Sequence, residues 1–417
     1  MGRIRMVTLM AMLITLFLIF YASLHLETSS SYRIDQRYVT RNYLDNNYEM
    51  EATLETESIT RAQPKVYNVS EDFKKLIPDN KAYWNRMLHF GLRSQDNGKR
   101  LFPDNMDCNK ANREYMQLNL HDINKYPALF QDFLLLMNCR IFPVIINPPA
   151  KCISRKGDRK HKTTLLLAIK STPWNFVQRQ VVRETWGQEI EYEGGVIVKT
   201  LFLLGTTSQD SPDLSSLLAF EAKRFGDILQ WEFQESFFNL TLKMNLFLRW
   251  TQTNCPHVSF VFSGDDDVFV NTPALASYLQ SLNPSKADQL YVGHILSSAS
   301  PIRDPKNKYY IPMSYYDGPY PLYAGGGGFI ISGALLHPLY IISQVIPFFP
   351  IDDVYTGMCA KALGIIPEEH KDFHTFDIRE QDREDLCVHK KLILIHQRLP
   401  KEMKRLWRGI HSPLLTC

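Results

Sequence analysis

The sequence predicts an α/β domain built on a mostly parallel central sheet. From Thr163 onward, short apolar runs typical of buried strands alternate with helix-like segments. Alternation of this kind gives a sheet whose strands run mainly in one direction. The fourth apolar run leads directly into three adjacent carboxylates, Asp265-Asp266-Asp267. Because ligands of such sheets bind beyond the carboxyl ends of the strands, we expect the functional site at this triplet.

The individual elements follow from the apolar runs and the residues that interrupt them. We expect strands at Thr164–Ile169, Val196–Leu204, Ile228–Trp231 and Val258–Phe262. Ser171 or Thr172 is a candidate cap for the first helix. A second helix opens at Ser211-Pro212 and closes at Gly226, and a third spans Leu240–Trp250.

Composition excludes some classes of protein. The chain has 417 residues, of which 45% are hydrophobic and 22% charged, so it is long enough for one large or two medium globular domains. Its formal net charge of +3 is too small and too dispersed to indicate a nucleic-acid-binding protein.

The N-terminus has the features of a membrane anchor. Arg3 and Arg5 precede an uncharged apolar run from Met6 to Leu24, and a helix of that length rises about 28 Å, close to the thickness of a bilayer core. The positive-inside rule then places the N-terminus in the cytosol and the chain after Leu26 in the lumen. The alternative is a cleaved signal peptide, whose apolar core is shorter and ends in a small-residue cleavage site. No second run of that length follows.

We expect five segments along the chain. Residues 1–5 form a cytosolic tail, residues 6–26 the anchor helix, and the polar residues 27–75 a stem. Residues 76–158 form an N-terminal lumenal extension, with a helix over Asp122–Met137, packed on the main domain at 159–417.

The seven cysteines and two glycosylation sequons fit an oxidising, lumenal compartment. No two cysteines form a CxxC metal pair, so we expect disulfides with one thiol left over, and the pairing stays open. Asn68 and Asn239 each begin an N-x-S/T sequon. Asn239 has an alternative role as a cap for the following helix.

The acidic triplet indicates a divalent metal. In extended backbone Asp265 and Asp267 point to the same side, and two carboxylates there suit a hard ion such as Mn²⁺ or Mg²⁺. Such an ion can stabilise a departing diphosphate. The alternative is an acidic surface turn, but the apolar residues on both sides argue against a solvated face.

Four blocks in fixed order resemble the β1,3-glycosyltransferase family (glycosyltransferase family 31). The resemblance covers about residue 135 to the C-terminus. The blocks are Val182–Gly187, Phe262–Asn271, Tyr323–Phe329 and Pro350–Cys359. The four consecutive glycines, the Pro-Ile-Asp-Asp-Val sequence and the C-terminal His411–Cys417 look most like the β1,3-N-acetylglucosaminyltransferase branch. Two departures stand out: Ser263 replaces the family's usual lysine, which removes a positive charge near the site, and Gln234–Phe238 replaces the usual acidic-Asp-x-Tyr segment.

The resemblance implies a fold and catalytic roles. It implies a GT-A-type nucleotide-sugar-binding domain that uses Mn²⁺, or Mg²⁺ in its place, with UDP-GlcNAc as donor. Asp353 is then the catalytic base, at the start of a helix whose dipole keeps a carboxylate ionised; simple helix capping is the alternative. His396, at the end of an apolar run, is then the third metal ligand beside Asp265 and Asp267, although a lone histidine there is more often structural.

The donor-binding assignments are less distinctive. We also assign Asp266 and Asp352 to the donor. Arg179 and Arg183, one helical turn apart, face the donor phosphates, pair with the acidic cluster or form a purely structural ion pair. The tyrosine-rich stretch that contains Tyr309 offers aromatic faces to a sugar or packs in the core. Gly326 and Gly327 permit close backbone approach to a sugar or form a flexible loop. Trp186 is expected in the core.

These observations predict a type II Golgi membrane enzyme. It transfers N-acetylglucosamine from UDP-GlcNAc to the 3-hydroxyl of terminal β-galactose on a glycoprotein or glycolipid, with inversion. The sequence leaves dimerisation open, whether as a homodimer or as a heterodimer with other glycosyltransferases. The alternatives are a β1,3-galactosyltransferase that uses UDP-galactose, a non-catalytic lumenal glycan-binding protein, and a metal-dependent phosphodiesterase. The acceptor itself is left open.

Overall fold

The computed structural model describes residues 68–96, 113–153, 163–208 and 210–417. The predicted cytosolic tail, anchor and most of the stem lie outside the described residues. Within the described part, no helix is both long and apolar enough to cross a membrane. Val66–Cys417 form one compact unit. Helix α2 (Glu71–Leu76) already belongs to it, since Phe73 is fully buried and Ser70 Oγ donates a hydrogen bond to the Lys361 carbonyl, so the packed body begins before the predicted stem boundary at 75.

The central sheet is mixed rather than uniformly parallel. Its order is β1-β5-β4-β2-β6-β11-β8-β12, with β3 beside β4. Strands β5, β4, β2 and β6 are parallel, whereas β11 runs antiparallel to both β6 and β8. The strands are β1 (Val144–Ile146), β2 (Thr163–Lys170), β3 (Glu191–Tyr192), β4 (Val196–Thr206), β5 (Ile228–Gln234), β6 (Phe260–Asp265), β8 (Tyr291–Gly293), β11 (Gly328–Ser332) and β12 (Glu368–Glu369).

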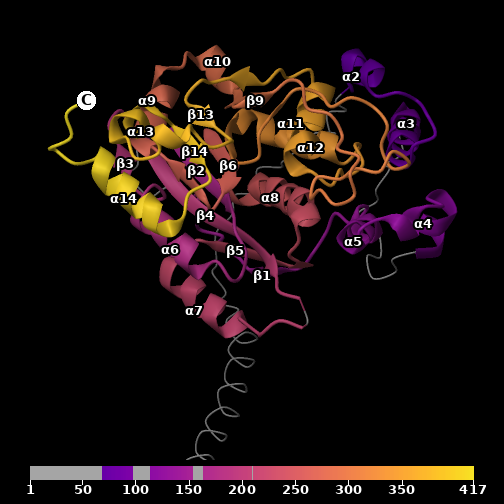
Figure 1. Cartoon of the computed structure of the whole chain (residues 1–417), viewed down its shortest axis with the longest axis horizontal. Helices are drawn as coiled ribbons and strands as arrows, with labels where there is room; N and C mark the ends of the chain where they lie inside the picture. The colour runs from indigo at the N-terminus through magenta and orange to yellow at the C-terminus, as the bar shows by residue number, and fades with distance from the viewer. Residues whose placement is uncertain (1–67, 97–112, 154–162, 209) are drawn as a thin grey trace, which may run out of the picture. The chain divides into compact units, whose positions relative to one another are not determined.

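Helices cover both faces of this sheet (Figure 1). In β2, Leu166 and Ala168 belong to the core on one face, whereas Leu165, Leu167 and Ile169 belong to the core on the other. This two-sided burial explains why the strand is apolar without alternation. The helices are α6 (Phe176–Glu184), α7 (Ser215–Phe225), α8 (Leu240–Asn254), α9 (Thr272–Ser281), α10 (Pro284–Asp288), α11 (Gly333–Ser343), α12 (Asp352–Ala362), α13 (Leu386–Lys391) and α14 (Pro400–Ile410).

Helices α6, α7 and α8 connect the parallel strands β2, β4, β5 and β6 and confirm the predicted alternation of strands and helices. Their ends differ from the predicted ends. Helix α6 begins at Phe176 rather than just after Ser171, because the intervening residues form a loop. Helix α7 ends at Gly226 as predicted, where the glycine adopts a left-handed backbone with φ 63°. Trp186 is fully buried, as expected.

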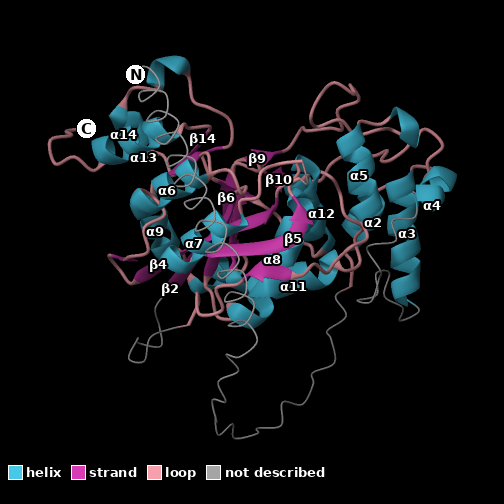
Figure 2. Cartoon of the chain, turned by 90° about the horizontal axis from the view of Figure 1, so that it is seen from below, coloured by secondary structure: helices cyan, strands magenta, loops and turns pink. Residues whose placement is uncertain are grey.

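The described residues 76–96 and 113–137 pack against the side of the sheet that carries α8, α11 and α12. Their helices are α3 (Tyr83–Asp96), α4 (Arg113–Asn119), η1 (Ile123–Lys125) and α5 (Ala128–Leu136). Figure 2 shows α3–α5 at the opposite end of the molecule from α13 and α14. Trp84 donates to the Pro347 and Phe348 carbonyls, and Phe130 stacks edge-on against Phe238. The helix expected over Asp122–Met137 is split because proline at position 127 lacks an amide hydrogen.

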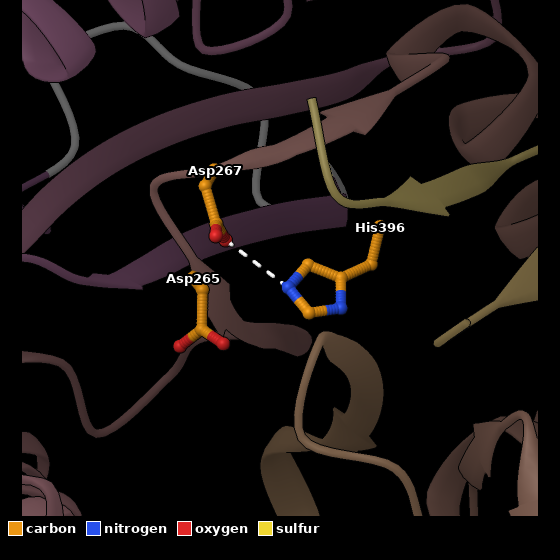
Figure 3. A group of neighbouring side chains, drawn as sticks. All are labelled: Asp265, Asp267 and His396. Carbon is orange, nitrogen blue, oxygen red and sulfur yellow. Dashed lines mark ion pairs between the residues drawn. The ribbon is translucent and has the colours of Figure 1, made fainter. Parts of the chain in front are cut away.

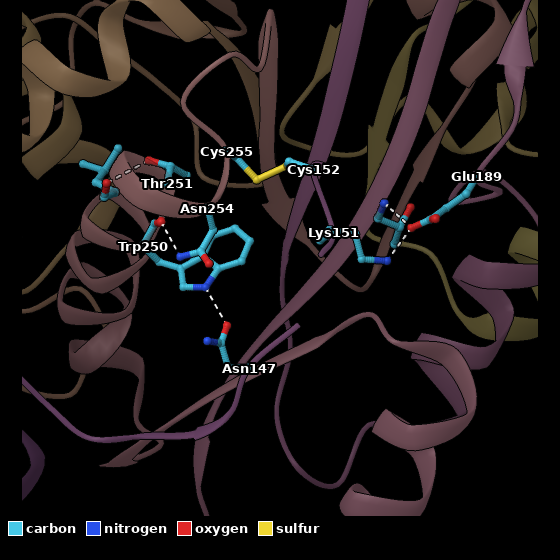
Figure 4. The surroundings of a disulfide bond; sticks show 10 residues. Asn147, Lys151, Cys152, Glu189, Trp250, Thr251, Asn254 and Cys255 are labelled. Carbon is cyan, nitrogen blue, oxygen red and sulfur yellow. Dashed lines mark hydrogen bonds and ion pairs between the residues drawn. A yellow bond between two sulfur atoms is a disulfide. The ribbon is translucent and has the colours of Figure 1, made fainter. Parts of the chain in front are cut away.

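Disulfides join Cys152 to Cys255 and Cys387 to Cys417, and Cys139 is also disulfide-bonded. The first bond ties the segment before β2 to the end of α8 (Figure 4). Nearby, Trp250 Nε1 donates to Asn147 Oδ1 over 2.9 Å. Among the described cysteines, Cys359 has a free, buried thiol, which confirms the expected leftover cysteine.

A small sheet completes the site. It consists of β13 (Phe373–His374), β14 (Leu394–His396) and β7 (Val268–Val270), in that order, and β9 (Ile295–Leu296) pairs with β10 (Tyr323–Ala324) nearby. Because β14 runs antiparallel to β7, His396 lies opposite Val268, the residue that follows the acidic triplet. This pairing brings His396, from near the C-terminus, to the end of β6.

Candidate active site

A cavity of about 820 Å³ opens at the carboxyl ends of β2 and β6. It is the place the sequence predicts for a ligand in this sheet. Most of the residues assigned to the site line it, namely Asp265, Asp266, Asp267, Tyr309, Gly326, Gly327, Asp352, Asp353 and His396.

Asp265, Asp267 and His396 converge in this cavity (Figure 3). One ligand atom from each residue lies within 4.8 Å of the others, and His396 Nε2 is 3.4 Å from Asp267 Oδ1. The Nδ1 of His396 bonds to the Thr375 carbonyl over 2.8 Å, and since a carbonyl only accepts, Nδ1 carries the proton. Nε2 is therefore the nitrogen that faces the carboxylates. The Asp267 contact raises the pKa of His396 above its ordinary value, and Nε2 serves as a metal ligand in its unprotonated form.

The three residues suit a hard divalent cation. The Asp267 side chain uses Oδ2 to accept from Gln397 Nε2, whereas its Oδ1 is buried and has no hydrogen-bond partner among the described residues. Burial raises the pKa of Asp267, but the contacts with His396 and Gln397 and a backbone hydrogen bond together outweigh it and hold the pKa below its ordinary value. An ionised carboxylate oxygen whose contact is with the His396 imidazole, next to a second carboxylate, matches the ligands of Mn²⁺ or Mg²⁺.

Asp266 has a different role from its two neighbours. It is buried and accepts hydrogen bonds from Ser171 Oγ at 2.6 Å and from the Asn175 amide at 2.9 Å. Burial raises the pKa of Asp266 to about 6. The middle carboxylate thus fixes the loop between β2 and α6, which also lines the cavity.

Lys170 is a site residue that sequence reasoning missed. Its ammonium is 3.1 Å from Asp265 Oδ1, 2.9 Å from Asp352 Oδ2 and 3.2 Å from the Gly326 carbonyl. Burial lowers the pKa of Lys170, but the two carboxylates outweigh it and raise the pKa above its ordinary value. The positive charge that seemed absent at Ser263 is therefore supplied by the adjacent strand, where Lys170 pairs in register with Asp265. The sequence did contain a signal for this role, because Lys170 is the only charged residue between Leu165 and Lys170 and ends the apolar run that predicts a strand.

Asp353 lies in the first turn of α12, and its carboxylate reaches the cavity. Oδ2 accepts from the Gly326 amide at 2.9 Å, and Oδ1 accepts from the Val354 amide at 2.7 Å. The N-cap is Ile351, so Asp353 is not the helix cap. Burial, reinforced by Asp352 and opposed by Lys170, raises the pKa of Asp353 to about 7. A carboxylate with that pKa can take up and release a proton near neutral pH.

The glycine block lies between the base and the histidine. A Cβ on Gly326 would lie 3.2 Å from Asp353 Oδ2, and one on Gly327 would lie 3.1 Å from His396 Cβ. A Cβ on Gly328 would overlap with the Leu394 side chain. The glycines therefore allow close packing of the chain against Asp353 and His396, in addition to lining the cavity.

Arg179 and Arg183 do not line the cavity, which corrects their assignment to the donor phosphates. Arg179 is fully buried and bonds Glu221 through Nε at 2.9 Å and Nη2 at 2.7 Å. Arg183 pairs with Glu221 and Asp227, each at 2.7 Å. These contacts join α6 to α7 and to Asp227, the residue before β5, so the structural ion pair is the correct interpretation.

The remaining assigned residues are Tyr309 and the two sequon asparagines, of which one is exposed and one is buried. Tyr309 lines the cavity and stacks edge-on against Phe237 with ring centroids 5.3 Å apart. Asn68 is exposed, as a glycosylated asparagine must be. Asn239 is only 6% exposed and its amide donates to the Gln234 carbonyl, so the folded chain does not present it for glycosylation. Its side chain also makes no capping bond to α8.

The fold and this cavity define an α/β enzyme domain with a cation-suited acidic site. Residues 177–371 match the family model described as galactosyltransferase. N-acetyllactosaminide beta-1,3-N-acetylglucosaminyltransferase 2 of Mus musculus is 48% identical over 298 residues, which cover 71% of this chain and 73% of that protein. The Homo sapiens protein of the same name is 42% identical over 382 residues, which cover 88% and 94%.

A further relative, UDP-GlcNAc:betaGal beta-1,3-N-acetylglucosaminyltransferase 7 of Rattus norvegicus, is 43% identical over 297 residues, which cover 69% of this chain and 72% of that protein. The solved structure of a glycosyltransferase involved in glycosylation of the major capsid of PBCV-1 aligns with 58% of this chain and 98% of its own, at 13% identity and a TM-score of 0.32, which is a weak likeness. The sequence matches show that the chain belongs to the galactosyltransferase family, as the four motif blocks predict.

Proposed function

We propose that this protein is an inverting β1,3-N-acetylglucosaminyltransferase with a GT-A-type catalytic domain. It transfers N-acetylglucosamine from UDP-GlcNAc to the 3-hydroxyl of a terminal β-galactose. Relatives at 42–48% identity bear names that specify this linkage and this sugar. The observation that carries the proposal is the presence in one cavity of Asp353, with its pKa near 7, and the cation-suited group Asp265, Asp267 and His396.

The chain's own residues account for the proton and the orientation of the reactants. Asp353 takes the proton of the acceptor 3-hydroxyl while that oxygen attacks the anomeric carbon, on the face opposite the leaving diphosphate. The Gly326 and Val354 amides hold the Asp353 carboxylate in place for that transfer. Asp265, Asp267 and His396 would hold Mn²⁺ or Mg²⁺, which when bound would neutralise the charge of the UDP leaving group.

The cellular setting follows from the N-terminal sequence. The basic residues before the apolar run, the cysteines and the exposed Asn68 support a type II Golgi membrane protein whose catalytic domain is lumenal. The acceptors are galactose-terminated glycans on glycoproteins or glycolipids. Assembly as a homodimer, or with other glycosyltransferases, is part of the same proposal.

The test is an assay of the full chain in detergent with Mn²⁺ and N-acetyllactosamine. UDP-GlcNAc and UDP-galactose are compared as donors, because the family model carries the galactosyltransferase description. We expect a β1,3-linked N-acetylglucosamine product, complete loss of transfer in Asp353→Asn, and retention of metal-dependent UDP binding in that variant. Asp288→Asn, at an exposed position in α10, is the control. Transfer at the wild-type rate by Asp353→Asn would eliminate Asp353 as the base.

A further inference from the structure

One side of the cavity is aromatic, and Tyr320 is its most tightly held ring. Tyr316 stacks on it with centroids 6.0 Å apart and an interplanar angle of 24°. Phe349 and Tyr323 meet it edge-on at 5.8 and 6.3 Å. Three rings thus fix the orientation of Tyr320, and the residue lines the cavity.

The hydroxyl of Tyr320 is buried but bonds to no described residue. Its neighbour Tyr316 differs, since the Tyr316 hydroxyl donates to the Pro319 carbonyl. A buried hydroxyl without a partner destabilises the fold, so a rigidly placed one beside a cavity indicates a partner on the ligand. Burial, followed by the nearby tyrosines, raises the pKa of Tyr320 above its ordinary value, which keeps the phenol protonated as a hydrogen-bond donor.

The position of Tyr320 associates it with the acceptor rather than the donor. Tyr320 and Asp353 line the same cavity. Tyr323, which packs against the Tyr320 ring, belongs to β10, and that strand contacts α12, the helix that carries Asp353. In the proposed function Asp353 acts on the acceptor hydroxyl. The cation-suited group, which would serve the UDP diphosphate, is built from β6, the turn after it and β14. The exposed ring of Tyr309 and the ring of Phe237 line the same cavity and offer faces to the C–H surface of a sugar.

We propose that the Tyr320 hydroxyl donates a hydrogen bond to the galactose-terminated acceptor and positions it against Asp353. This inference rests on the proposed function and specifies how that function recognises its second substrate. Tyr320 is a positioning residue for the acceptor, and its ring is held in advance by Tyr316, Tyr323 and Phe349.

The test is Tyr320→Phe, which removes the hydroxyl and keeps the ring. Calorimetry measures binding of N-acetyllactosamine to the full chain in detergent, with Mn²⁺ and UDP present. We expect the acceptor Kd to rise about two- to tenfold, the factor that corresponds to one neutral hydrogen bond. The KM for UDP-GlcNAc stays unchanged. The Tm of the unliganded variant equals or exceeds that of the wild type, because no intramolecular bond is lost.

Tyr316→Phe is the matched control. It leaves the Pro319 carbonyl without its donor, so we expect a lower Tm with an unchanged acceptor Kd. A Tm loss in Tyr320→Phe with an unaltered acceptor Kd would show that its hydroxyl is structural, and a rise in donor KM alone would assign it to the donor. Failure of the wild-type protein to bind N-acetyllactosamine also overturns the inference. Binding without any transfer, by contrast, counts only against the proposed function.

Discussion

Lys170 connects Asp265, of the cation-suited group, to Asp352, the neighbour of the proposed base. Its replacement by methionine tests that role. Lys170→Met keeps the length of the side chain and removes the ammonium that pairs with Asp265 and Asp352. Only 3% of the Lys170 side chain is exposed, so both carboxylates lose a buried partner. Removing one member of a buried ion pair typically costs about 3–5 kcal/mol. We therefore expect the free energy of unfolding in urea and EDTA to fall by about that amount.

The same variant changes the pH dependence of transfer. Lys170 lowers the pKa of Asp353, which stands at about 7. Without the ammonium the pKa rises, so a smaller fraction of the base is ionised at neutral pH. The acidic limb of kcat/KM, near pH 7 in the wild type, should move to higher pH in Lys170→Met.

Two further variants separate the charge effect from a general loss of packing. The double variant Lys170→Met with Asp352→Asn removes one of the two carboxylates left unpaired, so it should recover part of the lost stability. Lys306→Met, at an exposed position, should leave both stability and the pH profile unchanged. If Lys170→Met unfolds within about 1 kcal/mol of the wild type and its pH profile does not move, the ion-pair argument is refuted.

Two other predictions concern Arg179 and the glycine block. Arg179→Met should lower the free energy of unfolding by about 3–5 kcal/mol, because it leaves Glu221 short of a buried partner, without changing the KM for UDP-GlcNAc. An increased KM with unchanged stability would instead return Arg179 to the donor. Gly326→Ala crowds Asp353 and should lower kcat at saturating Mn²⁺, whereas Gly327→Ala crowds His396 and should raise the Mn²⁺ concentration needed for half-maximal activity. Identical effects of the two substitutions would contradict the separate contacts.

The sequence alone was sufficient for the features that depend on neighbouring residues. The apolar runs predicted β2, β4, β5 and β6 to within a few residues, because burial on both faces requires a continuous apolar strand. Asp265 and Asp267 could be proposed as ligands, and Asp353 as base, because their local context places carboxylates at a strand end and a helix start. The positions of the helix ends were less accurate, since loops such as Ser171–Asn175 are shaped by contacts with Asp266.

The tertiary structure decided which distant side chains became partners. Lys170 meets Asp265 because β2 and β6 are neighbours, and His396 meets Asp267 because β14 pairs with β7. No local pattern specifies these pairings, which depend on the order of strands in the sheets. For the same reason the sequence could not tell that Arg179 turns inward to Glu221, or that the Asn239 amide is buried. Residue types thus determined the chemistry available to this protein, while strand order determined which groups act together.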